Sequence, residues 1–205
     1  MTACNLAPGV MMEDLADRVR IRDERVLSRR RYRLSEYALD YRRGNGAWQH
    51  MDREVFDRGH AAAVLPIDRA RGTVLLVSQF RLPAFLAGYR SPLIEVIAGS
   101  LDGDDPETCV RREAMEEAGV RIENPVPVFH CFMSPGAVTE RMHLFAADYG
   151  AASRTGAGGG LEHEGEDIEV LELTLARAME LVASGGICDA KTILLLQWAR
   201  LNLPA

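Results

Sequence analysis

Three glutamates, Glu113, Glu116 and Glu117, lie close together in the sequence, and their spacing is the feature that most directly suggests chemistry. On a helix that turns about 100° per residue, their side chains fall within an arc of about 100°. Carboxylates at this spacing repel one another unless cations relieve the repulsion. Hard divalent cations do so, because they bind clustered carboxylate oxygens. Taken alone, the pattern fits either a metal site or a solvated helix face whose charge Arg111 and Arg112 relieve.

The segment around these glutamates carries the signals of a helix with defined ends. Asp105 is a favoured N-cap residue, Pro106 stands at the first helical position, and Gly119 follows the last expected turn. An apolar arc lies beside the acidic one, and we expect it to pack against the core. Its members are Val110, Ala114, Met115 and Ala118.

Residues 98–120, AGSLDGDDPETCVRREAMEEAGV, resemble the Nudix box, the loop–helix–loop signature of hydrolases that cleave nucleoside diphosphates linked to another group. Residues 112–120 match its most specific part, REUxEExGU, where U is apolar. Two features depart from the usual pattern, since Asp104 stands at the customary glutamate and the loop after Gly99 is one residue shorter. This resemblance favours the metal site over the solvated face.

Further segments extend the resemblance over nearly the whole chain from about residue 26 and indicate the bacterial GDP-mannose pyrophosphatases. The resemblance implies Mg²⁺-dependent hydrolysis of a nucleoside diphosphate sugar, with GDP-mannose and water giving GMP and mannose 1-phosphate. The alternatives are a pyrophosphatase for ADP-ribose or another nucleotide sugar, which would typically carry proline in place of Ile97, and an inactive Nudix-type ligand sensor. The segments are REVFDRG (53–59), SQFR (78–81), LIEVIAGSLDGDDPETC (93–109), MSPGAVTE (133–140), GAGGG followed by EDIEVLEL (166–173), and DAKTILLL (189–196).

The resemblance also implies a metal centre. Its ligands for Mg²⁺, with Mn²⁺ as a possible substitute, are the backbone carbonyl of Ala98 and the carboxylates of Glu113, Glu117 and Glu166. Such an ion neutralises the carboxylates, polarises phosphorus and lowers the pKa of a water. We expect Glu116, Glu117 and Glu166 to take part in catalysis, with Glu166 the candidate to orient or deprotonate the attacking water. The alternative is that Glu166 is one loop glutamate among several.

The expected substrate contacts follow the same resemblance. Arginine forks suit phosphate oxygens, and glycine allows the backbone to approach a diphosphate closely. Arg53, Glu54 and Arg81 could each instead form an ordinary ion pair on a strand surface. Lys191 is conspicuous because the other 23 of the 24 basic residues are arginine, and a compact ammonium does not replace a planar guanidinium where space is tight. The expected substrate-binding residues are Arg53, Glu54, Arg81, Gly99, Ser100, Glu140 and Lys191.

Short apolar runs separated by turn residues predict the strands that must position these groups. Helices are predicted at 175–186 and 190–203, and the glycine-rich segment 153–167 is expected to be a mobile surface loop. Strands mixed with helices, without regular βαβ alternation, predict an α+β protein, an α/β/α sandwich on a mixed sheet. The predicted strands are residues 61–68, 72–80, 93–99, 127–134, 142–149 and 167–173.

Composition limits the partners and the compartment. The chain has 205 residues and a net charge of −6, which argues against a general nucleic-acid binder. No segment approaches the roughly 20 apolar residues of a membrane span. Four scattered cysteines without CxxC spacing favour free thiols in a reducing cytoplasm.

Residues 1–57 are expected to be an N-terminal β arm, and residues 58–205 the Nudix hydrolase domain. Runs 26–42 and 47–57, separated by a glycine-containing turn, predict a hairpin, whereas residues 10–25 are ambiguous. Because ten arginines are interleaved with seven acids in residues 1–43, a salt-bridged surface is favoured over an anion-binding one. In the family that this chain resembles, such an arm packs across a homodimer, so we expect a dimer in which Arg53 and Glu54 act in trans.

Overall fold

The computed structural model describes residues 14–203, which divide after Arg58 into two compact units. The first unit is an antiparallel sheet with the strand order β1-β2-β3, preceded by a short 3₁₀ helix, η1 (Ala16–Arg18). The sequence predicted only a two-stranded hairpin in this unit. The run 26–42, predicted as one strand, contains the end of the first strand, a bend at residues 30–32 and the second strand. Most of the first strand was missed because residues 19–25 are mostly charged. The three strands are β1 (Val19–Arg29), β2 (Arg33–Arg42) and β3 (Trp48–Asp57).

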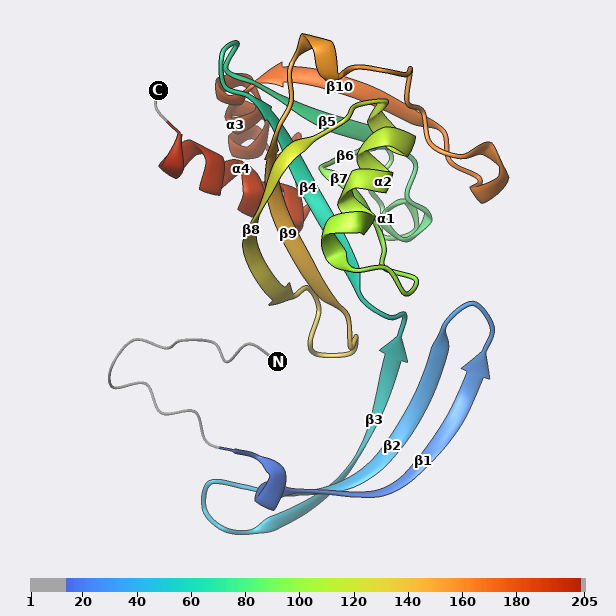
Figure 1. The fold of residues 1–205 in the computed structure, drawn as a ribbon. Helices are drawn as coiled ribbons and strands as arrows, with labels where there is room; N and C mark the ends of the chain where they lie inside the picture. The colour runs from blue at the N-terminus through green and yellow to red at the C-terminus, as the bar shows by residue number, and fades with distance from the viewer. Residues whose placement is uncertain (1–13, 204–205) are drawn as a thin grey trace. The chain divides into compact units, whose positions relative to one another are not determined.

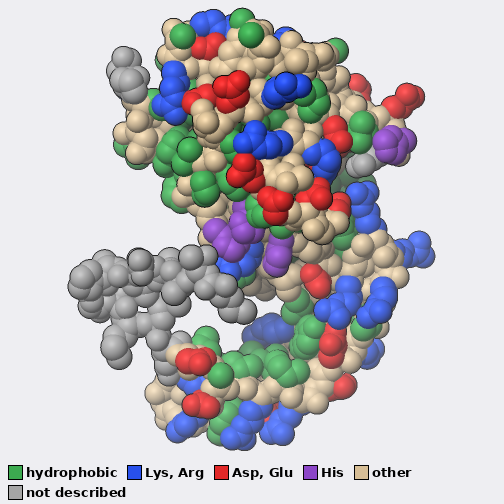
Figure 2. Space-filling view, viewed as in Figure 1, with side chains coloured by type: hydrophobic (Ala, Val, Ile, Leu, Met, Phe, Trp, Pro, Cys, Tyr) green, Lys and Arg blue, Asp and Glu red, His purple; other side chains and the backbone are tan. Residues whose placement is uncertain are grey.

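The surface of this N-terminal sheet is rich in ion pairs. Arg22 pairs with Asp40, and an Arg25 nitrogen lies 2.8 Å from a Glu36 oxygen. Figure 2 shows basic and acidic side chains interspersed over the unit, with hydrophobic side chains also at the surface. Among its described residues only Ser35 is buried. Arg22, Arg25 and Arg33 are thus paired with acids of the same sheet. With Ser35 as its only buried residue among those described, the sheet has no apolar core of its own.

The second unit contains a seven-stranded mixed sheet in the order β10-β5-β4-β9-β8, with β6 paired to β5 and β7 paired to β4 (Figure 1). The β4–β9 pair is parallel and the others are antiparallel. The predicted strand at 93–99 is interrupted at Val96, where the chain changes partner from β5 to β4. The strands are β4 (Ala61–Asp68), β5 (Thr73–Gln79), β6 (Leu93–Glu95), β7 (Ile97–Ser100), β8 (Glu123–Phe132), β9 (Arg141–Asp148) and β10 (Ile168–Thr174).

Helices cover both faces of this sheet (Figure 1). On one face, the residues of α2 (Pro106–Ala118) pack with Val64, Val77 and Ile97. On the other face, α3 (Leu175–Ser184) and α4 (Ala190–Asn202) pack with Leu65, Leu76 and Leu144. Alternate side chains of the strands enter opposite cores. This arrangement is the predicted α/β/α sandwich on a mixed sheet. Short helical segments α1 (Leu82–Leu86), η2 (Ala151–Ser153) and η3 (Glu162–Glu164) complete the unit.

The predicted ends of α2 are confirmed. The Asp105 side chain accepts hydrogen bonds from the backbone N–H groups of Glu107 and Thr108, and Gly119 takes the left-handed conformation at φ 63°. Val110, Ala114 and Ala118 are buried as expected. The expectation for Met115 is wrong, because its side chain remains 37% exposed, while Glu113 and Glu117 are buried instead. The buried face of α2 therefore includes two of the three glutamates and excludes Met115.

The predicted helices near the C-terminus are also present, and Gly185 ends α3 at φ 79°. The helix α1, which is only five residues long, was not predicted from the sequence. Cys109, Cys131 and Cys188 are free thiols, whereas Cys4 lies outside the described residues. Among the helices of residues 14–203, none is long and apolar enough to cross a membrane.

Candidate active site

The close approach of β7 to α2 forms the centre of the site. A Cβ atom at Gly99 would lie 1.7 Å from Oε1 of Glu113, so only glycine allows this separation without displacing the glutamate. The thiol of Cys109 lies 3.4 Å from the Ser100 carbonyl oxygen and acts as its weak hydrogen-bond donor. Gly99 and Ser100 are thus held against the first turns of α2, beside Glu113.

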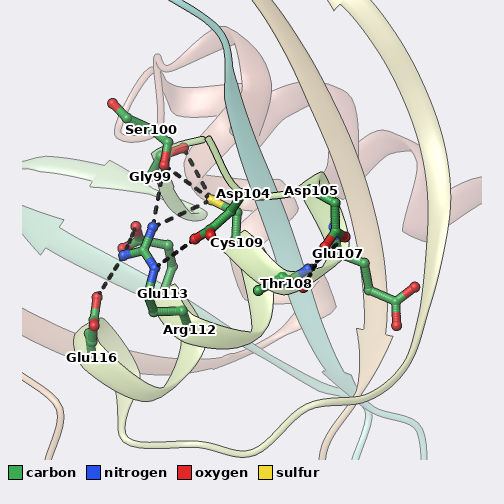
Figure 3. A network of polar contacts seen from close by, with 10 residues as sticks. All are labelled: Gly99, Ser100, Asp104, Asp105, Glu107, Thr108, Cys109, Arg112, Glu113 and Glu116. Atoms are coloured by element: carbon green, nitrogen blue, oxygen red, sulfur yellow. Dashed lines mark hydrogen bonds and ion pairs between the residues drawn. The ribbon is translucent and has the colours of Figure 1, made fainter. Parts of the chain in front are cut away.

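Arg112 joins this strand end to the acidic helix face (Figure 3). Its Nη1 lies 2.8 Å from Oε1 of Glu113 and 3.0 Å from Oε2 of Glu116. Its Nη2 donates to the Ser100 carbonyl oxygen at 3.3 Å, and its Nε donates to Oδ2 of Asp104 at 3.4 Å. Asp104, which stands at the customary glutamate position, therefore belongs to the network that holds Arg112.

Glu117 is the most buried carboxylate of the site, at 1% exposure. Its Oε2 accepts a hydrogen bond from the backbone N–H of Ala98 at 3.2 Å. Burial, reinforced by the charge of Glu113, raises the pKa of Glu117 to about 8. Burial also raises the pKa of Glu113 to about 7, although Arg112 opposes the shift. The protein thus places two carboxyl groups where solvent does little to stabilise their ionised forms.

The glycine-rich segment brings Glu166 toward these carboxylates. The N–H groups of Gly159 and Gly160 donate to the carbonyl oxygens of Glu117 and Glu116 at 2.9 and 3.1 Å. The Glu166 Oε2 atom accepts a hydrogen bond from the Leu161 N–H at 2.9 Å. Its charge contributes to the raised pKa of both Glu113 and Glu117. The segment expected to be a mobile surface loop is therefore hydrogen-bonded to the end of α2.

The donor set fits a hard divalent cation, because several buried carboxylates repel one another and such an ion would relieve them. In the described part of the chain, however, no three His, Cys, Asp or Glu side chains converge closely enough to hold a metal as they stand. The reason is visible in the contacts: Glu113 pairs with Arg112, and Glu117 turns to the Ala98 N–H. Metal binding would therefore require these two carboxylates to exchange partners.

Two further predicted residues, Arg81 and Lys191, meet at one carboxylate. Arg81 Nε donates to Oε2 of Glu95 at 2.6 Å, and Lys191 Nζ forms a short ion pair with Oε1 of the same group. Lys191 is only 7% exposed and also pairs with Asp189 at 3.0 Å. Sequence reasoning missed Glu95. Glu95 could have been found as the one charged residue in the apolar run LIEVIAG, because a buried acid requires a partner.

The structure places the remaining predicted residues as follows. Ala61 is paired with Ser100 on one side and Met142 on the other, so Glu140, just before β9, comes at the same end of the sheet as Ser100. Glu140 is buried at 8% exposure. Arg53 and Glu54 lie exposed on β3 in the N-terminal unit. Their contribution to the site stays a prediction.

Family models match both units. The model described as the NUDIX domain matches residues 57–192, and the model described as the GDP-mannose pyrophosphatase NudK N-terminal domain matches residues 18–56. The mixed sheet flanked by helices, with the box on β7 and α2, is thus a Nudix fold, and the chain belongs to the NUDIX family. The resemblance predicted from the sequence is confirmed.

Several relatives that match most of this chain are named GDP-mannose pyrophosphatase. The GDP-mannose pyrophosphatase of Pectobacterium atrosepticum is 46% identical over 178 residues, which cover 86% of this chain and 91% of the relative. That of Yersinia enterocolitica is 44% identical, covering 89% and 94%. A solved structure described as an ADP compounds hydrolase has a TM-score of 0.68 at 19% identity, covering 92% of this chain and 97% of its own. At that identity the likeness supports the fold alone.

Proposed function

We infer that this chain is a Nudix pyrophosphatase that hydrolyses GDP-mannose to GMP and mannose 1-phosphate. The observation that carries this inference is similarity over both units to proteins of that name, at 42–46% identity. The match of residues 18–56 to a GDP-mannose pyrophosphatase N-terminal model adds specificity, because this unit lies outside the Nudix box. The box by itself defines only the class of reaction.

The residues next to the carboxylates suit a diphosphate. Arg81 is held through Nε, so its two Nη groups remain for phosphate oxygens. Gly99 and Ser100 are both only partly buried, so we propose that their backbone contacts the diphosphate beside Glu113. We propose that Glu140 contacts the substrate from the start of β9. These groups would fix the diphosphate beside α2 and orient the bond to be broken.

We propose that Mg²⁺, or Mn²⁺ in its place, is held by the carbonyl of Ala98 with Glu113, Glu117 and Glu166. When bound, the ion would supply Lewis acidity toward the phosphoryl oxygens and make a nearby water more acidic. Arg112 would keep Glu116 oriented through its ion pair, and it would release Glu113 to the ion. Glu166 is our candidate to orient the attacking water and accept its proton, because it approaches the cluster from a separate segment.

We further propose that residues 1–57 form an arm that packs across a homodimer and that residues 58–205 form the hydrolase domain. The support is the lack of an apolar core in the N-terminal sheet, together with apolar side chains at its surface: Ile21 is 57% exposed and Trp48 is 40% exposed. A sheet of this kind is stabilised when another surface covers it. In this arrangement Arg53 and Glu54 would serve the partner's site.

The decisive experiment is a substrate panel with Mg²⁺ and product identification. It compares GDP-mannose, GDP-glucose, ADP-ribose and UDP sugars by kcat/KM. We expect GDP-mannose to have the highest value and to give GMP and mannose 1-phosphate in equal amounts. A clear preference for ADP-ribose would contradict the proposed substrate while leaving the family unchanged.

A further inference from the structure

Glu95 is a buried carboxylate that contacts two cations at once. It lies on β6 and is 3% exposed. Each of its oxygens has a separate partner, with Oε2 accepting from Arg81 Nε at 2.6 Å and Oε1 paired with Lys191 Nζ. A buried carboxylate is stable only when its oxygens are satisfied in this way. Glu95 therefore connects the end of β5, the strand β6 and the start of α4.

The backbone next to Glu95 fixes this connection. The N–H of Val96 donates to Oγ1 of Thr192 at 2.8 Å, and that hydroxyl donates to Oδ2 of Asp189 at 2.6 Å. Asp189 is also the N-cap of α4. Lys191 is consequently held opposite Glu95 by hydrogen bonds of its neighbours as well as by its own charge.

Glu95 orients Arg81 by binding the Nε edge of its guanidinium. Within residues 14–203, Glu95 is the only hydrogen-bond partner of the Arg81 guanidinium, and it contacts the Nε edge. The charges of Glu117 and Glu166 also act on this guanidinium. The two Nη groups are thus left unbonded by the described residues, within electrostatic range of the carboxylates that we assign to metal binding.

We propose that Glu95 is a positioning residue for hydrolysis. It binds Nε of Arg81, with Lys191 as the counter-cation of Glu95, so that the Nη groups of Arg81 face the diphosphate. This inference rests on the proposed function, because it requires a diphosphate substrate. Glu95 does not itself touch the substrate. Its effect is carried by Arg81.

The first test is Glu95→Gln, which keeps the size of the side chain but can accept a hydrogen bond at only one of its two polar atoms. We expect KM for the preferred substrate to rise by about tenfold, with kcat changed by less than about twofold, since Arg81 contacts the phosphates before and during the reaction. The matched control is Glu172→Gln. Glu172 also contacts two arginines, Arg71 at 2.5 Å and Arg154 at 3.9 Å. Its contacts include Thr73 at the start of β5, whereas Arg81 follows the end of that strand. The kinetics of Glu172→Gln should be unchanged.

A double-mutant cycle with Arg81→Ala separates positioning from a general structural effect. If Glu95 acts through Arg81, Glu95→Gln changes kcat/KM by less than about twofold in the Arg81→Ala background. An equal fold-loss in both backgrounds, or a fall in kcat at unchanged KM, would overturn the proposal. Glu95→Asp, which keeps the charge but shortens its reach, enters the same cycle if Glu95→Gln does not fold. Failure of both variants to fold would also overturn it, since Glu95 would then be a structural residue.

The cycle remains informative if the proposed substrate is wrong. Wild-type protein that prefers another nucleotide sugar contradicts the proposed function. The cycle is then measured with that sugar, because the expected role of Arg81 concerns the diphosphate, which all these substrates share.

Discussion

At the scale of single residues, the burial of Glu113 and Glu117 raises their pKa values and makes the free protein sensitive to pH. The pKa of Glu117 is about 8 in the folded chain, compared with an ordinary value of 4.5. A raised pKa means that folding favours the protonated form, so this contribution to stability is complete below pH 4.5 and is lost as pH rises through 8. Stability of the metal-free protein should therefore decline between these pH values.

Replacement of Glu117 by glutamine removes this residue's part of the pH dependence, whereas the part that comes from Glu113 remains. In EDTA, Glu117→Gln should match wild type at pH 5 and exceed its free energy of unfolding at pH 8.5 by roughly 2–4 kcal/mol, since one pKa unit corresponds to about 1.4 kcal/mol. Urea denaturation at the two pH values measures this. Added Mg²⁺ should stabilise wild type more than the variant, because the ion binds the ionised form. An unchanged pH slope in Glu117→Gln would contradict the assignment.

The solitary lysine is a second prediction at the residue scale. Lys191 is 7% exposed between Glu95 and Asp189, and the larger, planar guanidinium of arginine has no room there without displacing its neighbours. Lys191→Arg should lower stability by about 1–3 kcal/mol and reduce kcat/KM about tenfold or more. Arg200→Lys, at an exposed position near the end of the same helix, is the control for thermal unfolding and kinetics. Unchanged kinetics in Lys191→Arg would mean that the single lysine of the chain stands at this position by coincidence.

At the scale of elements, the glycine-rich segment depends on its close contact with the end of α2. A Cβ at Gly158 would lie 2.4 Å from the carbonyl oxygen of Glu117, whereas a Cβ at Gly185 meets nothing within 4 Å. Both glycines have positive φ, 70° and 79°, so alanine at either position has a similar conformational cost of about 1 kcal/mol. Only Gly158 adds a steric conflict.

Gly158→Ala should therefore destabilise the protein by more than Gly185→Ala and should also reduce kcat, because moving this segment displaces Glu166. Gly185→Ala should retain kcat within about twofold. Thermal unfolding and steady-state kinetics of the pair measure both effects. Equal loss of kcat in the two variants would argue against a catalytic role for the anchored segment.

At the scale of the whole molecule, the proposed exchange of arms between subunits can be tested by complementation. Arg53→Ala removes a proposed substrate contact of the arm, and Glu117→Gln removes a proposed metal ligand on α2. Each homodimer should therefore have little activity. In a mixed dimer with arms acting in trans, one site carries both changes and the other carries neither. Random mixing of refolded subunits should restore about a quarter of wild-type activity.

The control for this experiment is a mixture of Glu117→Gln with Glu113→Gln, two changes in the same helix that cannot complement in trans through the arm. Mass measurement by light scattering establishes the oligomeric state in parallel. A monomeric mass with full activity, or no recovery in the mixture, would contradict the proposed arrangement.

The sequence by itself determined the helix of the box, its ends and the family, because capping, helical periodicity and the spacing of the glutamates are local features. Its predicted sandwich and most of its strands also follow from local apolar patterns. Most of β1 was missed because its first residues are mostly charged, and the run 26–42 was predicted as one strand although it contains a bend. The burial of Met115 was wrong because helical periodicity does not show which of two neighbouring arcs faces the core.

Tertiary structure alone decided how distant residues meet. Arg81, Glu95 and Lys191 come from three elements, and their contact depends on β6 pairing with β5 while α4 is bonded to Val96. The burial that raises the pKa of Glu117 likewise depends on the approach of β7 and the glycine-rich segment to α2. Burial and contacts between elements depend on strand register and packing, which no short stretch of sequence contains.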